Sequence, residues 1–274
     1  MTTAALDRVA YRQSRARRST LVALSSTVVF AAVLLFAVTS SPGWPRVRDS
    51  FFNLRIGVDS LPALLEGLWL NVRVLVVCQV LILVFGLGLA ALRTLRGPVW
   101  FPVRALATGY VDLFRGLPLL ICLYLVGFGL PGLRLSGLPT NPVLLGGLAL
   151  VLIYSAYVAE VFRAGIESIH PSQLAAARSL GLNHRKTMRL VVLPQALRVT
   201  VPPLISQTLN LWKDTSIATV IGVAEMMYQA ARVESASFRS AEAFAFATSA
   251  YLAVSLAITG LASWYHHRYP VRTL

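Results

Sequence analysis

Long apolar segments alternate with short polar stretches along almost the whole chain. Each apolar segment has roughly the length of helix needed to cross the hydrocarbon core of a bilayer, about 20 residues. The segments cover residues 21–38, 63–92, 103–130, 143–162, 199–223 and 244–264. Because lipid offers backbone groups no hydrogen-bond partners, such segments cross a membrane as helices. The pattern predicts an all-α protein, a polytopic membrane bundle of about six transmembrane helices.

One polar stretch, residues 170–198, is much longer than the others. It is basic, rich in alanine and amphipathic, and it lies between two apolar segments. Its residue types predict two short helices, the first capped by Ser172 and ended by Gly181, which can adopt the left-handed conformation. Asn183 is suited to cap the second helix, over residues 184–192. By itself, such an insert either rests on lipid headgroups or lies in a groove of another protein.

The composition agrees with a membrane protein, since 56% of the residues are apolar and 13% are charged. A net charge of +14 would indicate nucleic-acid binding in a soluble protein. Here the positions of the basic residues explain the charge, because most of the 25 Lys and Arg fall on one side if the insert and both termini are cytoplasmic. We therefore predict contacts with membrane lipid and no nucleic-acid partner.

The N-terminus resembles a secretory signal in having a basic arm, residues 1–20, before an apolar segment. However, the apolar segment is longer than a usual signal core, and no clear small-x-small cleavage site follows it. We expect the arm to be cytoplasmic, and residues 21–60 to form an additional, retained transmembrane helix with an outer loop.

Residue types that carry catalysis or bind metals are not arranged for either task. Cys78 and Cys122 lie within predicted spans, so they indicate neither a disulfide framework nor a metal site. The four histidines show no metal-ligand spacing. No G-x-x-x-x-G-K-[ST] loop occurs, so any ATP-driven work falls to a partner. We predict that the chain is not an enzyme by itself and binds no cofactor.

The fifth apolar segment carries polar residues at helical spacing. Gln207, Asn210 and Asp214 follow one another at i, i+3 and i+7, which places them on one face. Such a face lines an aqueous path or bonds to neighbouring helices. Asp214 is suited to hold a substrate ammonium, or to pair with Lys213 or Arg115.

The third apolar segment contains a charged pair followed by residues that disfavour a helix. Arg115 lies three residues after Asp112, a spacing that predicts an ion pair on one helix. Gly116 and Pro118 come next, and together they predict a bend or an unwound segment. Arg115 is therefore a candidate for a gate or for the substrate path.

Glu160 is the charged residue of greatest interest in the fourth segment. A charge within a membrane span is costly and is by default a functional candidate. Arg163 follows three residues later, so the two side chains can pair. Glu160 is predicted either to contact the substrate or to stabilise the insert through that pair.

The long insert resembles the signature loop of permease subunits in ATP-binding-cassette importers, usually written E-A-A, three residues, Gly, nine residues, Ile, one residue, Leu-Pro. The matching residues are Ala175, Ala176, Ala177, Gly181, Val191, Leu193 and Pro194. The spacing is kept throughout, and Ala175 replaces the usual acidic residue.

Three further motifs are similar to segments of the polar amino acid branch of these permeases, the branch that carries histidine, glutamine and glutamate. They are LFRGLPLL at 113–120, YSAYVAEVFRAGI at 154–166 and LWKDTSIATVIGVAEM at 211–226. The resemblance covers about residues 61–270, which would form the permease domain, with its coupling loop at residues 170–194. The first span would be additional to a five-helix core.

The resemblance implies an importer subunit of the bacterial plasma membrane. Two ATP-binding-cassette ATPase subunits, which use ATP and Mg, would dock on the coupling loop. A second permease subunit, identical or similar, would complete the path, and an extracytoplasmic binding protein would deliver a polar amino acid. Coupling would rest on Ala175, Ala176, Ala177, Gly181, Leu193 and Pro194.

Two other classes of protein fit parts of the pattern. A self-sufficient transporter driven by an ion gradient predicts an internal sequence repeat, and the two halves of the chain do not resemble each other. A scaffold or insertase-like protein would use the basic arm and insert, but it leaves the polar face of the fifth segment unexplained. The amino acid carried, and the choice between homodimer and heterodimer, are open at this stage.

Overall fold

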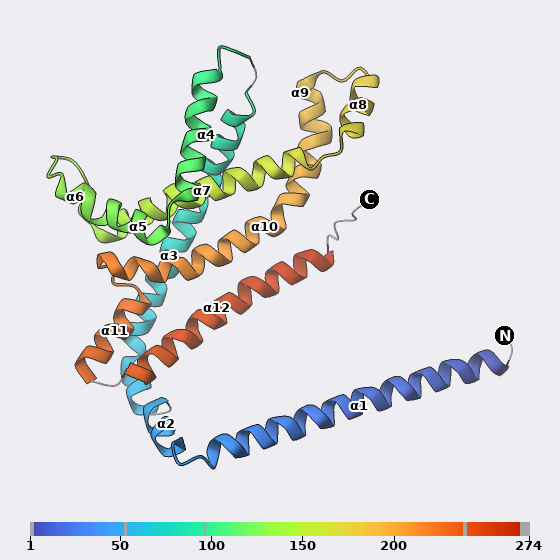
Figure 1. Cartoon of the computed structure of the whole chain (residues 1–274), viewed down its shortest axis with the longest axis vertical. Coiled ribbons are helices and arrows are strands. Elements are labelled where there is room, and N and C mark those ends of the chain that lie inside the picture. Colours follow the sequence, from blue (N-terminus) through green and yellow to red (C-terminus); the bar gives the residue numbers. More distant parts are fainter. Residues whose placement is uncertain (1–2, 52–53, 96, 238–239, 269–274) are drawn as a thin grey trace. The chain divides into compact units, whose positions relative to one another are not determined.

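The computed structural model describes residues 3–51, 54–95, 97–237 and 240–268 (Figure 1). Within these ranges every regular element is a helix, as predicted. Five helices are long and apolar enough to cross a membrane, and one sharply bent pair brings the number to six. The chain divides into two compact units, Met1–Asn53 and Leu54–Leu274.

The first unit consists of α1 (Thr3–Thr39) and α2 (Trp44–Phe51). The predicted first span is the apolar part of α1, Ser19–Thr39. Hydroxyl groups within it donate to carbonyl oxygens of the preceding turn, as Thr27 does to Ala23 at 2.8 Å. Such bonds satisfy polar side chains inside the helix, so the span needs no polar partner in lipid.

The second unit contains the other spans. They are α3 (Leu54–Arg93), the pair α4 (Phe101–Gly116) and α5 (Leu119–Tyr124), α7 (Pro142–Glu167), α10 (Leu193–Asp214) and α12 (Ser240–Arg268). α7 is the most buried of them and packs against α3, α4, α5 and α10. The main apolar core surrounds α7, with buried side chains such as Ile82, Leu123 and Leu211 from its neighbours.

Close approach of the helices to α7 depends on residues without side-chain bulk. A Cβ atom on Gly86 of α3 would lie 2.6 Å from Val158 Cγ1, and one on Gly165 of α7 would lie 2.1 Å from Thr200 Cγ2 of α10. Both distances are far inside van der Waals contact. Small residues at these crossings therefore let α3 and α10 pack tightly on α7, as is common in membrane bundles.

The second predicted span is too short at its N-terminal end. α3 begins at Leu54 rather than at residue 63. Just beyond these extra turns α3 is supported by packing, because α11 (Met226–Ser237) and the start of α12 bury a small apolar cluster against Leu64. Periodicity in one segment does not reveal such support from distant segments.

The third span is broken, as Gly116 and Pro118 predicted. α4 ends at Gly116, Leu117 is extended with ψ of 129°, and α5 starts after Pro118. The two helices are bent by 107°. A proline that cannot donate a backbone hydrogen bond accounts for the end of α4 at this point. η1 (Leu125–Gly129) and α6 (Leu130–Gly132) continue the second half.

The long insert folds as helix, turn and helix. α8 (Pro171–Ser179) is followed by Gly181 with φ of +77°, and Asn183 Oδ1 accepts from the Lys186 amide at 2.9 Å, so both local predictions are confirmed. The predicted N-cap of α8 is wrong: His170 Nδ1, not Ser172, accepts a backbone amide, that of Ser172 at 3.2 Å.

The second helix of the insert does not end at residue 192, as predicted. α9 (His184–Thr187) and η2 (Met188–Val192) run directly into α10 and then η3 (Thr215–Ile221) as one helical span, His184–Ile221. The insert is thus continuous with a membrane helix, which makes α9 a direct extension of the fifth span.

Candidate functional site

The polar face of α10 opens onto a pocket of about 370 Å³ beside α7. The lining residues are Tyr154, Tyr157, Gln207, Asn210, Lys213 and Asp214. The three residues predicted to share a face of the fifth span therefore do line one space. Two tyrosines of α7, Tyr154 and Tyr157, which the sequence pattern did not single out as a pair, form the opposite wall.

Asp214 is held by a hydroxyl rather than by a cation. The Tyr154 hydroxyl donates to Asp214 Oδ2 at 2.6 Å, and the rings of Tyr154 and Tyr157 meet edge-on with centroids 6.0 Å apart. Among the ion pairs of the described residues, none joins Asp214 to Lys213 or Arg115. The pocket therefore presents one carboxylate and one ammonium group that are not neutralised by each other.

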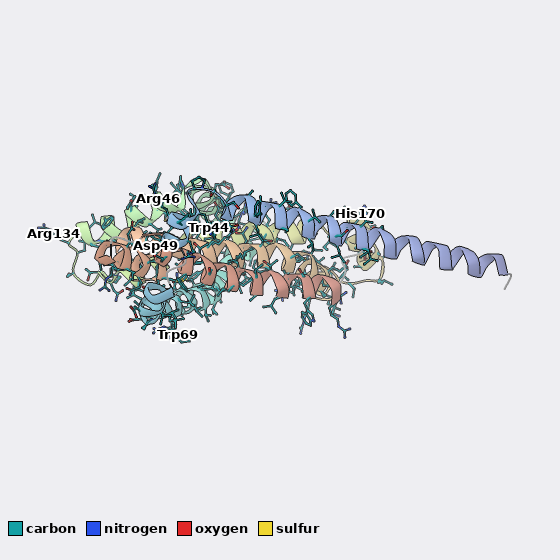
Figure 2. The ribbon with its side chains drawn as sticks, turned by 90° about the horizontal axis from the view of Figure 1, so that it is seen from below. Trp44, Arg46, Asp49, Trp69, Arg134 and His170 are labelled. Atoms are coloured by element: carbon teal, nitrogen blue, oxygen red, sulfur yellow. The ribbon has the colours of Figure 1, made fainter. Side chains whose placement is uncertain are left out.

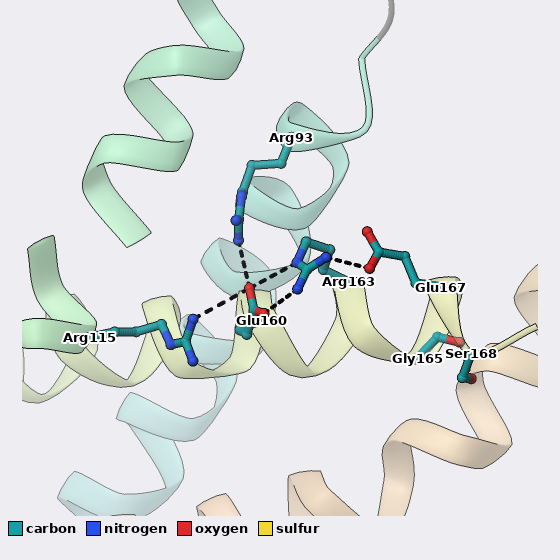
Figure 3. A network of polar contacts seen from close by, with 7 residues as sticks. All are labelled: Arg93, Arg115, Glu160, Arg163, Gly165, Glu167 and Ser168. Carbon is teal, nitrogen blue, oxygen red and sulfur yellow. Dashed lines mark hydrogen bonds and ion pairs between the residues drawn. The ribbon is translucent and has the colours of Figure 1, made fainter. Parts of the chain in front are cut away.

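A second polar centre surrounds Glu160, toward the end of α7 that leads to the insert (Figure 3). Arg93 of α3 donates to Glu160 Oε2 at 2.9 Å, and Arg163 donates through Nε at 3.0 Å and through Nη2 to Oε1. Arg163 also pairs with Glu167. The predicted pair of Glu160 and Arg163 is present, and Arg93 is a partner that periodicity did not suggest.

Arg115 also approaches Glu160, but less closely. Its Nη1 lies 3.6 Å from Glu160 Oε2, across the contact between α4 and α7. The predicted pair with Asp112 is not among the ion pairs of the described residues. The Arg115 carbonyl oxygen accepts from the Tyr157 hydroxyl at 3.5 Å, so this residue connects the Glu160 centre with the wall of the pocket.

A third polar centre, the Asn71 node, consists of Asn71, Thr215, Glu225 and Tyr251. Asn71 Nδ2 lies within hydrogen-bond distance of Thr215 Oγ1, Glu225 Oε2 and the Tyr251 hydroxyl, at 2.9, 3.1 and 2.8 Å. Its Oδ1 accepts from the Met226 amide at 3.0 Å. One buried side chain thus joins α3 to the end of α10, to α12 and to the start of α11.

Glu225 caps α11 within this node. Its two oxygens accept from the amides of Met227 and Tyr228, both at 2.9 Å, which satisfies the free donors of the first turn. The residue is 1% exposed. Burial raises the pKa of Glu225 above its ordinary value of 4.5, against the opposing effect of its hydrogen bonds.

The coupling residues predicted in the insert lie partly at the surface. Ala175, Ala176 and Gly181 are exposed, whereas Ala177 is buried. Leu193 and Pro194 occupy the first turn of α10. Below α8, a small apolar cluster of Ile169, Val192 and Ala196, with Leu174 and Met188, attaches it to the ends of α7 and α10.

Sequence reasoning missed the Asn71 node, although a signal for it was present. Thr215 and Glu225 both belong to the 211–226 motif, whose purpose was unassigned beyond Asp214 and Lys213. Gly222, with φ of +84°, forms the turn that brings Glu225 back to Asn71. The motif therefore builds two things at once, the pocket wall and the node.

Residues 82–270 match the family model described as "Binding-protein-dependent transport system inner membrane component". The chain belongs to this family. The matched range contains the pocket, the Glu160 centre and the whole insert, and it leaves α1 outside.

Relatives with similar sequences are permeases. The probable glutamine ABC transporter permease protein GlnM of Bacillus subtilis is 34% identical over 76% of this chain and 93% of its own length. The glutamate/aspartate import permease protein GltK of Escherichia coli O157:H7 is 33% identical over 77% of this chain and 95% of its own length. The arginine transport system permease protein ArtQ of B. subtilis is 33% identical over 74% of this chain and 90% of its own length.

Solved structures agree with this family. A chain from the crystal structure of an amino acid ABC transporter with histidines is 31% identical and superposes with a TM-score of 0.72, covering 77% of this chain and 96% of that one. A chain of the MetNI methionine ABC transporter, 16% identical, superposes with a TM-score of 0.63 over 76% and 97%, which shows the shared fold. The protein is a multi-pass membrane protein of the importer permease fold.

Proposed function

We propose that this chain is the transmembrane permease subunit of an ATP-driven importer of polar amino acids. The observation that carries the proposal is the family match over residues 82–270, which contains a pocket lined by both an acidic and a basic side chain. The relatives named for glutamine, glutamate/aspartate and arginine support the substrate class. The ion-coupled alternative has no comparable support.

The pocket suits the backbone groups that all amino acids share. Asp214 is suited to bind the ammonium group of a substrate, and Lys213 its carboxylate. Gln207 and Asn210 add donors and acceptors for a polar side chain. Because Tyr154 already bonds one oxygen of Asp214, the carboxylate is held in position before a substrate arrives.

The insert suits a docking element for two separate ATPase subunits. Exposed alanines on α8 allow close approach to a groove, and α9 is continuous with α10, so a displacement of the insert is transmitted to the wall of the pocket. In this proposal the partners bind ATP and Mg²⁺, and the chain itself holds neither.

The remaining features of the assembly belong to the same proposal. The chain lies in a bacterial plasma membrane with both termini cytoplasmic, since that orientation places most basic residues inside. A second permease, identical or similar, shares the path, and an extracytoplasmic binding protein delivers the amino acid.

Purification of a tagged chain from its native membranes tests the proposal. Mass spectrometry is expected to find an ATPase subunit, and ATP hydrolysis by the intact complex is expected to rise with one polar amino acid and its binding protein. Isolation of the chain alone, with uptake that depends on a proton or sodium gradient in liposomes, would overturn it.

A further inference from the structure

The Glu160 centre holds more positive than negative groups. Its members are Arg93, Arg115, Arg163, Glu160 and Glu167. Both oxygens of Glu160 already accept hydrogen bonds from Arg93 and Arg163, and Glu167 pairs with Arg163. One guanidinium group therefore remains without a hydrogen-bonded carboxylate.

Arg115 carries this surplus charge. At 3.6 Å its contact with Glu160 is beyond ordinary hydrogen-bond length, and no other ion pair of the described residues involves it. Its side chain is 40% exposed, against 13% for Arg93. The planar donor set of Arg115 is thus accessible and matches the geometry of a free carboxylate.

The position of Arg115 places it next to the pocket on the way to the insert. Tyr157 lines the pocket and also donates to the Arg115 carbonyl oxygen. Glu160 follows Tyr157 by three residues, on the same side of α7. α4 ends one residue after Arg115, where the chain bends by 107°, so this side chain stands at the corner of a broken span (Figure 3).

We infer that Arg115 binds the carboxylate of the transported amino acid after it leaves the pocket, and that it biases the permease toward acidic and neutral amino acids and against arginine and lysine. The inference rests on the proposed function. A surplus guanidinium attracts a second carboxylate, as in glutamate or aspartate, and repels a cationic side chain. The repulsion is strongest where water is scarce, as in a narrow membrane path.

Direct binding is measured on the permease–ATPase complex in lipid nanodiscs, without the binding protein. This separates the effect of Arg115 on selectivity from the selectivity of the binding protein. The probes are radiolabelled glutamate, glutamine and arginine. Wild type is expected to prefer glutamate to arginine, and Arg115→Gln to lose about tenfold in glutamate affinity without losing arginine binding.

Arg134→Gln is the matched control, because it removes the same charge from an exposed residue. Arg134 lies in the loop after α6, at the opposite end of the unit from His170 (Figure 2). This variant is expected to bind all three amino acids as wild type does. Equal losses in both variants would overturn the inference, as would wild-type glutamate affinity in Arg115→Gln.

A second variant and two wild-type outcomes complete the test. If Arg115→Gln does not assemble with the ATPase, Arg115→Lys decides: it keeps the charge but loses the bidentate geometry, so unchanged glutamate affinity would contradict the inference. A wild-type complex that binds no amino acid would overturn the proposed pocket together with this inference. Stronger wild-type binding of arginine than of glutamate overturns the inference alone.

Discussion

The Glu160 centre and the Asn71 node are both polar clusters that join α7 or α3 to distant helices, but they differ in kind. The Glu160 centre consists of charges that are partly exposed, with side-chain exposures of 13% to 61%. The Asn71 node consists mainly of neutral groups around one carboxyl, and Asn71 itself is fully buried. Exposed ion pairs exchange partners at little cost, whereas a buried network loses most of its energy when one member is removed.

The difference suggests a division of labour between the two regions. The centre next to the insert is suited to rearrange during transport, and the node is suited to stay fixed. Substitutions near the insert should therefore reduce uptake without unfolding the protein, and those at the node should reduce stability first.

The largest effect on uptake is expected from Gly181→Val. A β-branched residue at φ of +77° is strained by about 1–2 kcal/mol and would distort the turn between α8 and α9. Uptake should fall to background while the protein stays in the membrane, as measured by radiolabelled amino acid uptake and immunoblotting. Gly97→Val, also at positive φ but outside the insert, is the control for strain alone. Normal uptake by the Gly181 variant would contradict the proposal that the insert transmits its displacement to the pocket.

The largest effect on stability is expected from Asn71→Leu. The change leaves the Met226 amide and the Thr215 hydroxyl without this partner inside the core, which costs about 3 kcal/mol in the free energy of unfolding. Thermal unfolding of the purified complex measures it. Asn210→Leu, in the open pocket, should change stability little and uptake strongly. If both variants unfold alike, the node does not stabilise the fold more than the pocket does.

Gly165→Ala tests the close crossing of α7 and α10. Its methyl group would lie 2.1 Å from Thr200 Cγ2, so α7 and α10 must separate. Such overpacking should lower the free energy of unfolding by about 1–3 kcal/mol. Gly88→Ala in α3 meets no atom within 4 Å and should be neutral or slightly stabilising. Equal melting temperatures for the two variants would show that the crossing is loose.

Glu160→Gln removes the carboxylate that three arginines share. Loss of a partly exposed partner should lower the free energy of unfolding by about 1–2 kcal/mol, less than loss of Asn71. Denaturation of the wild type and variant complexes at low and high salt measures this, since salt screens the remaining repulsion among the arginines. Glu167→Gln, at a more exposed residue, should have the smaller effect. A larger effect of Glu167→Gln would mean that the pair of Arg163 with Glu167, not that with Glu160, contributes more to stability.

The smallest effect concerns pH. Because burial raises the pKa of Glu225, the neutral carboxyl is favoured more in the folded state than in the unfolded chain. Its contribution to stability is full below its ordinary pKa of 4.5 and is lost as pH rises through the raised value. As pH rises above 4.5, the melting temperature of the wild type should therefore fall more than that of Glu225→Gln. Identical pH profiles would mean that this carboxyl does not titrate in that range.

Much of the fold and part of the site could be predicted from the sequence. The bend at Gly116 and Pro118 and the left-handed Gly181 follow from local backbone chemistry, and the common face of Gln207, Asn210 and Asp214 follows from helical periodicity. The local pairing of Glu160 with Arg163 was equally accessible. The cap of α8 was predicted wrongly because histidine is an uncommon cap. The Nδ1 atom of His170 accepts the backbone amide in place of the expected serine hydroxyl.

The sequence by itself determined the number of membrane helices, the long insert and the turn within it. These features depend on the cost of bare backbone groups in lipid and on the conformational limits of single residues. Only the tertiary structure decided which polar groups meet. Tyr154 binds Asp214 across 60 residues, Arg93 binds Glu160 across 67, and Asn71 binds Glu225 across 154. Such contacts depend on how helices cross, and the crossings are set by the small residues of α3 and α7 together with every side chain packed against them.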